Sequence, residues 1–106
     1  MSLSARELLS ESLLSHPGVS RQPHRFGGIE FVYEGKEIGH VHGDHLVDIL
    51  FPKPVRDELV ASGRAQPHHM FPESGWVSVY IKSGDDAASA IEMLKLKYDL
   101  MASKQR

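Results

Sequence analysis

Residues 29–51 read IEFVYEGKEIGHVHGDHLVDILF, and this stretch decides the fold of the chain. Apolar and polar residues alternate through it, which is the pattern of strands with one buried face. The pairs Glu34-Gly35 and Gly43-Asp44 interrupt the alternation. Both are typical of two-residue hairpin turns, because glycine readily adopts a positive φ. We therefore predict an antiparallel meander of strands at 29–34, 36–42 and 45–51.

The flanking sequence predicts helices and one more strand. Ser4 and Glu7 form a capping box before a leucine-rich helix that ends at His16-Pro17-Gly18, and a polar connection follows to Arg25. Further elements are a helix at 54–62, a loop through 67–72, a strand at 76–81 and a helix at 85–101. The prediction is one two-layer α+β domain over residues 1–106, in the order αβββαβα. Its four-stranded antiparallel sheet would be the meander plus one strand, with flanking helices.

Composition excludes several classes of protein. The chain has 106 residues, no cysteine and a net charge of −2, so disulfides and thiolate metal sites are ruled out. The absence of cysteine favours a cytoplasmic protein. Scattered lysines and arginines argue against a nucleic-acid partner, and no segment is long and apolar enough for a membrane span.

Two-residue turns would fix the register of the meander, and with it the two faces of the sheet. They pair Phe31 with Ile38, His40 with Val47, and His42 with His45. One face would carry the core residues together with three histidines: Ile29, Phe31, Tyr33, Ile38, His40, His42, His45, Val47, Ile49 and Phe51. The carboxylates Glu37 and Asp48 would lie on the opposite face.

The three histidines are the best candidates for a functional site, because imidazoles gathered on an apolar face need an explanation. We assign His40 and His42 as candidate catalytic residues. Candidate ligand-binding residues are His45, His68, His69, Tyr33 and Arg25. No carboxylate or cysteine stands at a diagnostic spacing, so we predict no metal site. The alternative is that the histidines are structural, hydrogen-bonded at the end of the sheet.

Three runs of sequence resemble the small bacterial luciferase-domain family. They are HRFGGIEF at 24–31, EIGHVH at 37–42 and PHHMFPESGWVS at 67–78, and the resemblance extends from about His24 to Tyr98. The family is named for its relation to fungal luciferase, which oxygenates a small phenolic pyrone with O₂ and without a metal or organic cofactor. The resemblance implies that His40, His42 and His68 belong to the family pattern, and that no cofactor is needed.

We therefore expect a domain that binds a small aromatic or enolic ligand in a histidine-lined pocket. If it is an enzyme, the resemblance implies cofactor-free oxygenation, with an imidazole as general base. Two alternatives stay open. One is a non-catalytic interaction module that dimerises through the wide apolar stripe of the last helix or a sheet edge, and the other is a histidine-based metal-binding domain.

Overall fold

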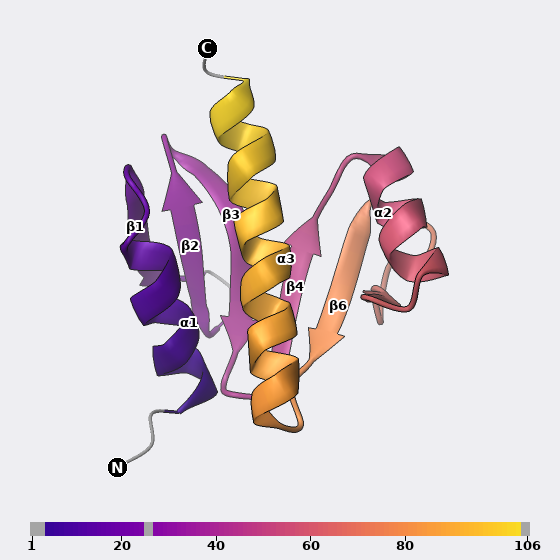
Figure 1. The fold of residues 1–106 in the computed structure, drawn as a ribbon, viewed down its shortest axis with the longest axis horizontal. Helices are drawn as coiled ribbons and strands as arrows, with labels where there is room; N and C mark the ends of the chain where they lie inside the picture. The colour runs from indigo at the N-terminus through magenta and orange to yellow at the C-terminus, as the bar shows by residue number, and fades with distance from the viewer. Residues whose placement is uncertain (1–3, 25–26, 105–106) are drawn as a thin grey trace.

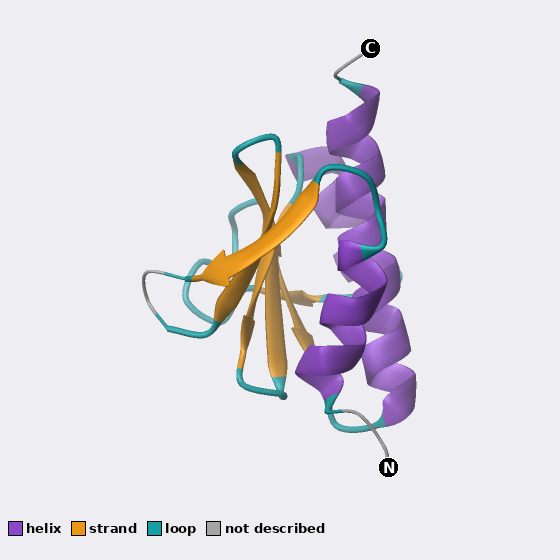
Figure 2. Cartoon of the chain, turned by 90° about the vertical axis from the view of Figure 1, so that its left-hand side faces the viewer, coloured by secondary structure: helices purple, strands orange, loops and turns teal. Residues whose placement is uncertain are grey.

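The computed structural model describes residues 4–24 and 27–104 and confirms the α+β class. All three helices that it describes pack on one face of an antiparallel sheet with the strand order β1-β2-β3-β4-β6-β5 (Figures 1 and 2). The elements are α1 (Ala5–Leu14), β1 (Val19–Pro23), β2 (Ile29–Tyr33), β3 (Lys36–His42), β4 (Leu46–Leu50), α2 (Lys53–Ala61), β5 (Gln66–Pro67), β6 (Trp76–Tyr80) and α3 (Gly84–Ser103). None of the described helices could cross a membrane.

The sheet has six strands rather than the predicted four. β1 pairs with β2 where the sequence predicted a polar connection, and β5 pairs with β6 where it predicted a loop. Both added strands are at the edges of the sheet and are largely exposed. An edge strand with little buried surface needs no alternation of apolar residues, so neither left a hydrophobic pattern in the sequence.

The first hairpin contains a bulge that the predicted register lacked. Its Glu34-Gly35 turn and the pairing of Tyr33 with Lys36 are confirmed, and both turn residues have a positive φ. Beyond it, however, Phe31 pairs with Gly39 instead of Ile38. Gly39 makes this possible, because a Cβ there would lie 2.7 Å from Leu94 of α3. Ile38 is buried in the core, as predicted, and the bulge shifts the rest of β3 by one residue.

The second hairpin has a three-residue turn, Gly43-Asp44-His45, instead of the predicted two-residue turn. His40 therefore pairs with Asp48, and His42 pairs with Leu46. The prediction that His42 faces His45 is wrong, as is the placement of His40 and His42 on the core face. Because side chains alternate along a strand, the one-residue shift puts both histidines on the face away from the helices, together with Asp48.

The core lies between the sheet and the helices. Phe31, Val47 and Ile49 are fully buried there, as predicted. Leu94 and Tyr98 of α3 are buried against the sheet, and Leu96, Leu100 and Met101 pack partly buried around the same core. The hydroxyl group of Tyr98 donates a hydrogen bond to the Pro17 carbonyl at 2.8 Å. The opposite face of the sheet is thus left free to carry polar side chains.

Candidate functional site

Asp48 is the centre of the candidate site. It lies on β4, on the face of the sheet away from the helices, and is 1% exposed. Its Oδ1 accepts a hydrogen bond from the Ser78 hydroxyl of β6 at 2.8 Å. A buried carboxylate is costly unless its charge is balanced and its oxygens are hydrogen-bonded. The groups that balance Asp48 are histidines.

Four imidazoles surround the other oxygen of Asp48. Oδ2 lies 3.1 Å from Nε2 of His42 and 3.3 Å from Nε2 of His40, both on β3. It lies 3.4 Å from Nε2 of His68 and 3.5 Å from Nε2 of His69, which come from the loop between β5 and β6. Four of the histidines that the sequence singled out therefore meet at one buried charge.

A second carboxylate lies behind His40. Glu37 Oε2 is 2.7 Å from Nδ1 of His40, and Glu37 Oε1 is 3.6 Å from Nε2 of His24. The rings of His24 and His40 stack with their centroids 4.1 Å apart. His40 thus has a carboxylate at each of its two nitrogens.

This placement makes His40 a cation at neutral pH. Burial lowers the pKa of His40, but the hydrogen bonds to Asp48 and Glu37 outweigh burial and raise its pKa to about 9. For Asp48, burial raises the pKa of the carboxyl, but hydrogen bonds from His40 and Ser78 hold it well below its usual range. A protonated His40 is able to stabilise an anion but is not available as a general base.

His68 is held in one tautomer by the loop that follows it. Its Nδ1 accepts hydrogen bonds from the backbone N–H groups of Met70 and Phe71, each at 3.1 Å. A neutral imidazole that accepts at Nδ1 carries its proton on Nε2, so His68 donates toward Asp48. Burial lowers the pKa of His68 despite the opposing charge of Asp48, which favours this neutral form.

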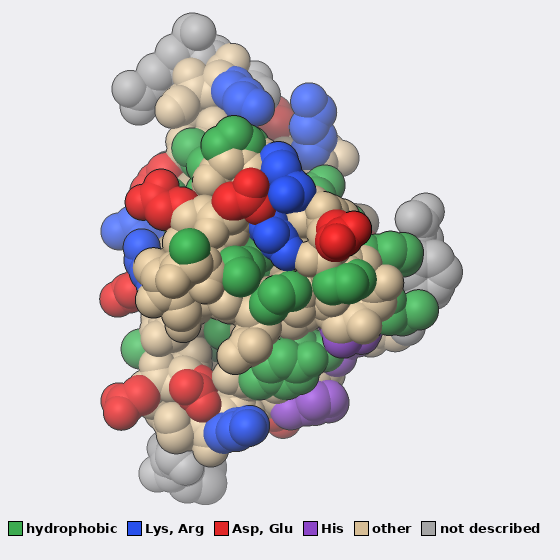
Figure 3. All heavy atoms as spheres, turned by 90° about the vertical axis from the view of Figure 1, so that its right-hand side faces the viewer, with side chains coloured by type: hydrophobic (Ala, Val, Ile, Leu, Met, Phe, Trp, Pro, Cys, Tyr) green, Lys and Arg blue, Asp and Glu red, His purple; other side chains and the backbone are tan. Residues whose placement is uncertain are grey.

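The same loop supplies apolar side chains to a cavity of about 570 Å³. Met70 and Phe71 of the loop and Trp76, the first residue of β6, line it together with Asp48 and the histidines. Figure 3 shows histidine side chains beside hydrophobic ones on this side of the molecule. Trp76 lies within 6 Å, centroid to centroid, of both His40 (5.5 Å) and His68 (5.8 Å). The lining therefore combines apolar side chains, here called the apolar wall, with charged and polar side chains, here called the polar wall.

Residues 74–76, with the sequence SGW, fix the conformation of the loop and the position of Trp76. The Ser74 hydroxyl donates to the Phe71 carbonyl at 2.7 Å and accepts from the Trp76 N–H at 3.1 Å. A Cβ on Gly75 would lie 2.4 Å from the Phe51 carbonyl oxygen, so only glycine fits this position without movement of the chain. Arg56 of α2 donates a hydrogen bond to the Pro72 carbonyl and ties the loop to the helix layer.

Two of the predicted ligand-binding residues are not brought to the cavity. His45 is exposed in the turn between β3 and β4. Tyr33 is on the helix-covered face, where its ring stacks on Tyr98 at 5.1 Å. Arg25 lies outside the described residues. Four further residues line the cavity that the sequence had not marked as site residues: Asp48, Glu37, His24 and Trp76. The interior Gly39 signalled the bulge, and a correct register would have placed Asp48 beside the histidines.

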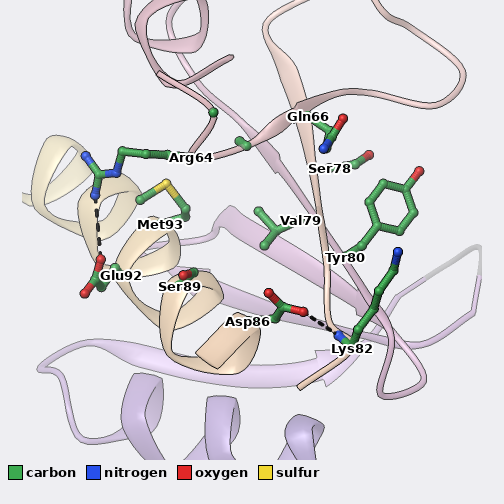
Figure 4. A pocket seen from close by; sticks show the side chains of 12 residues that line it. Arg64, Gln66, Ser78, Val79, Tyr80, Lys82, Asp86, Ser89, Glu92 and Met93 are labelled. Atoms are coloured by element: carbon green, nitrogen blue, oxygen red, sulfur yellow. Dashed lines mark hydrogen bonds and ion pairs between the residues drawn. The ribbon is translucent and has the colours of Figure 1, made fainter. Parts of the chain in front are cut away.

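A second hollow, of about 450 Å³, lies between β6, the segment 63–66 and the N-terminal half of α3 (Figure 4). Three of its charged side chains have neighbours inside the hollow: Arg64 lies 3.7 Å from Glu92, and Asp86 accepts a hydrogen bond from the backbone N–H of Lys82 at 2.8 Å. It contains neither histidine nor a tryptophan wall. The cavity over Asp48 is the better candidate for chemistry.

Comparison with known proteins gives one match. The model of a family described as the Luciferase domain matches residues 35–97, which is more than half of the chain. The matched span includes Glu37, both β3 histidines, Asp48, the loop histidines and Trp76. No curated protein matches the chain, and no solved structure does.

Proposed function

The chain belongs to the luciferase domain family. From this we propose that the cavity binds a small, planar phenol or enol and stabilises the anion that forms when the acidic hydroxyl group of this ligand loses its proton. The observation that carries the proposal is the combination of two unlike sets of side chains in one cavity. Met70, Phe71 and Trp76 line it together with Asp48 and its histidines.

The apolar wall suits a flat ring. Aromatic side chains bind planar molecules through offset stacking and the removal of apolar surface from water. Phe71 and Met70 are 56% and 68% exposed, so they offer apolar surface that a ligand would cover. Specificity would then come from the few polar groups that the ligand meets on the other wall.

The polar wall suits an acidic hydroxyl group that becomes an anion. His40, protonated between two carboxylates, supplies a fixed positive charge. His42 is 31% exposed, and its Nε2 faces Asp48, so its neutral form carries the proton on Nε2 and keeps Nδ1 as a base. We assign His42 the role of accepting the ligand's proton, with Asp48 orienting the ring and stabilising the imidazolium that forms.

Oxygenation is the activity that family membership adds to this binding proposal. A phenolate or enolate gives up electrons to O₂ far more readily than its neutral form does. Deprotonation at His42 is thus the step that this pocket would contribute to a reaction with O₂. Binding and deprotonation can be tested first, because both are measurable without turnover.

The test uses a hydroxycoumarin, whose phenol and phenolate forms absorb at different wavelengths, with a chelator present. Binding should shift the bound dye toward phenolate absorption and quench Trp76, the only tryptophan of the chain. His42→Phe should abolish the shift to phenolate. His45→Ala is the matched control, because this imidazole is exposed outside the cavity, and it should behave as the parent does. An unshifted dye spectrum and unchanged fluorescence with the parent would contradict the proposal.

A further inference from the structure

The atoms around Asp48 Oδ2 are spaced like the ligands of a metal ion. The four Nε2 atoms lie 3.1, 3.3, 3.4 and 3.5 Å from this oxygen, and only the shortest has an ordinary hydrogen-bond length. Ligands that hold an ion at about 2.0–2.1 Å lie about 2.9–3.4 Å apart in octahedral or tetrahedral shells. The distances from this oxygen to His42, His40 and His68 fall within that range.

We propose that His40 Nε2, His42 Nε2 and Asp48 Oδ2 bind a divalent first-row transition-metal ion. One ligand atom from each of these three residues lies within 4.8 Å of the other two. The two histidines project from the same face of β3, and Asp48 is paired with His40 across the ladder. Two imidazoles and one carboxylate occupy three positions of a shell and leave the others for water or a ligand oxygen.

Two other triplets in the cluster are less suitable. Asp48, His68 and His69 also lie within 4.8 Å of one another, but His68 Nε2 carries its proton because Nδ1 accepts two backbone hydrogen bonds. In the triplet of His24, Glu37 and His40, Glu37 lies 2.7 Å from His40 Nδ1. That is a hydrogen-bond length and is shorter than the spacing of two ligands on one ion.

The groups behind the proposed ligands are those that metal sites use. Metal-binding histidines commonly donate their second N–H to a carboxylate, which turns the free lone pair toward the ion. Glu37 is placed to accept this hydrogen bond from Nδ1 of His40. The Ser78 hydroxyl likewise donates to the Asp48 oxygen that does not face the histidines. In the metal-free protein the proton on His40 supplies the positive charge that the ion would supply.

The donor set indicates the kind of metal. Imidazole nitrogen with one carboxylate suits Zn²⁺, Fe²⁺, Co²⁺ and Ni²⁺, whereas Mg²⁺ and Ca²⁺ prefer shells of oxygen alone. The sequence predicted no metal because no carboxylate or cysteine stood at a diagnostic spacing. The predicted register also separated Asp48 from the histidines, and that register is wrong. The proposed metal site lies in the same cavity as the proposed ligand site, but it uses only residues of the polar wall. A bound ion would also lower the pKa of a hydroxyl group that coordinates it.

The experiment titrates Zn²⁺ and Co²⁺ into tag-free protein with no organic ligand present. We expect one equivalent of Zn²⁺ by calorimetry, a rise in melting temperature, and visible Co²⁺ bands from coordination by nitrogen. Asp48→Asn and His42→Gln should weaken binding by about a hundredfold or more. His42 is partly exposed, so its variant should fold even if Asp48→Asn does not. His68→Ala should keep one equivalent, and His45→Ala should bind as the parent does.

The outcomes separate this inference from the proposed function. A parent protein that takes up no equivalent of either ion overturns the metal site, and so does unchanged affinity in folded His42→Gln. Loss of the bound equivalent in folded His68→Ala would contradict the assignment of ligands. None of these results affects dye binding, because the hydroxycoumarin is tested with a chelator present.

Discussion

At the scale of single residues, His40 controls how the stability of the protein depends on pH. Its pKa rises from 6.5 to about 9 on folding, so the folded state holds a proton that the unfolded state releases. This stabilisation is complete below pH 6.5 and is lost as the pH rises through 9. The full shift corresponds to at most about 3 kcal/mol.

We therefore predict that the parent loses stability between pH 6.5 and 9.5, whereas His40→Gln loses much less over the same range. Chemical denaturation at several pH values, in buffer with a chelator, measures the difference. Parallel curves for the two proteins would show that His40 does not carry this proton.

Two substitutions should separate the structural role of one histidine from the chemical role of its neighbour. His40→Ala leaves Glu37 and Asp48 without their shared partner and should lower the free energy of unfolding by about 1–3 kcal/mol. His42→Phe removes one of several partners of Asp48 at a partly exposed position, so it should change stability by less than about 1 kcal/mol. Urea unfolding of both variants measures the two changes in the free energy of unfolding. A larger loss of stability in His42→Phe than in His40→Ala would contradict the assignment of the structural role to His40.

At the scale of elements, the loop between β5 and β6 is positioned by its contact with the end of β4. Gly75→Ala would push a Cβ into the Phe51 carbonyl and displace Trp76. We predict a loss of about 1–3 kcal/mol together with weaker dye binding. Gly84→Ala is the matched control, because nothing lies within 4 Å of a Cβ at that helical position. Thermal melting and dye titration of both variants test this prediction. Equal melting temperatures and equal dye affinities for the two variants would show that Gly75 is not needed to position the loop and Trp76.

Elements with a strong hydrophobic pattern were predictable from the sequence. The first and last helices, the three strands of the meander and the strand near 76–81 are all present, because each buries a periodic set of side chains. The edge strands β1 and β5 bury little and could not be recognised in this way. A hydrophobic pattern in the sequence reflects which side chains are buried. A strand that is held mainly by backbone hydrogen bonds buries few side chains and therefore shows little hydrophobic pattern.

The candidate site was predicted only in part, for a related reason. His40, His42, His68 and His69 were recognised from their residue type, and they do meet. Asp48 was correctly placed on the face away from the core, but His40 and His42 were assigned to the core face, because the bulge at Ile38 and the length of the second turn both differ from the predicted register. Register depends on turn conformation and on packing against α3, neither of which a local pattern encodes.

At the scale of the whole molecule, the core and the candidate site lie on opposite faces of one sheet. Leu94 of α3 is fully buried on the core side. We predict that Leu94→Ala lowers the free energy of unfolding by about 2–5 kcal/mol. Dye affinity, measured well below the melting temperature, should stay close to that of the parent. A large loss of affinity in the folded variant would show that the two faces are coupled through the sheet.

The turn Gly43-Asp44-His45 has a consequence for which changes of chain length this protein tolerates. The backbone of His45 is used, since its N–H donates to His42 and its carbonyl accepts from Ile81, but its side chain is exposed. Almost any residue could replace His45. Deletion of His45, however, would leave a two-residue turn. The side chains of either β3 or β4 would then point to the other face of the sheet, so that Asp48 and the two β3 histidines would no longer share a face. Natural relatives should therefore vary freely in residue type at this position while rarely losing it.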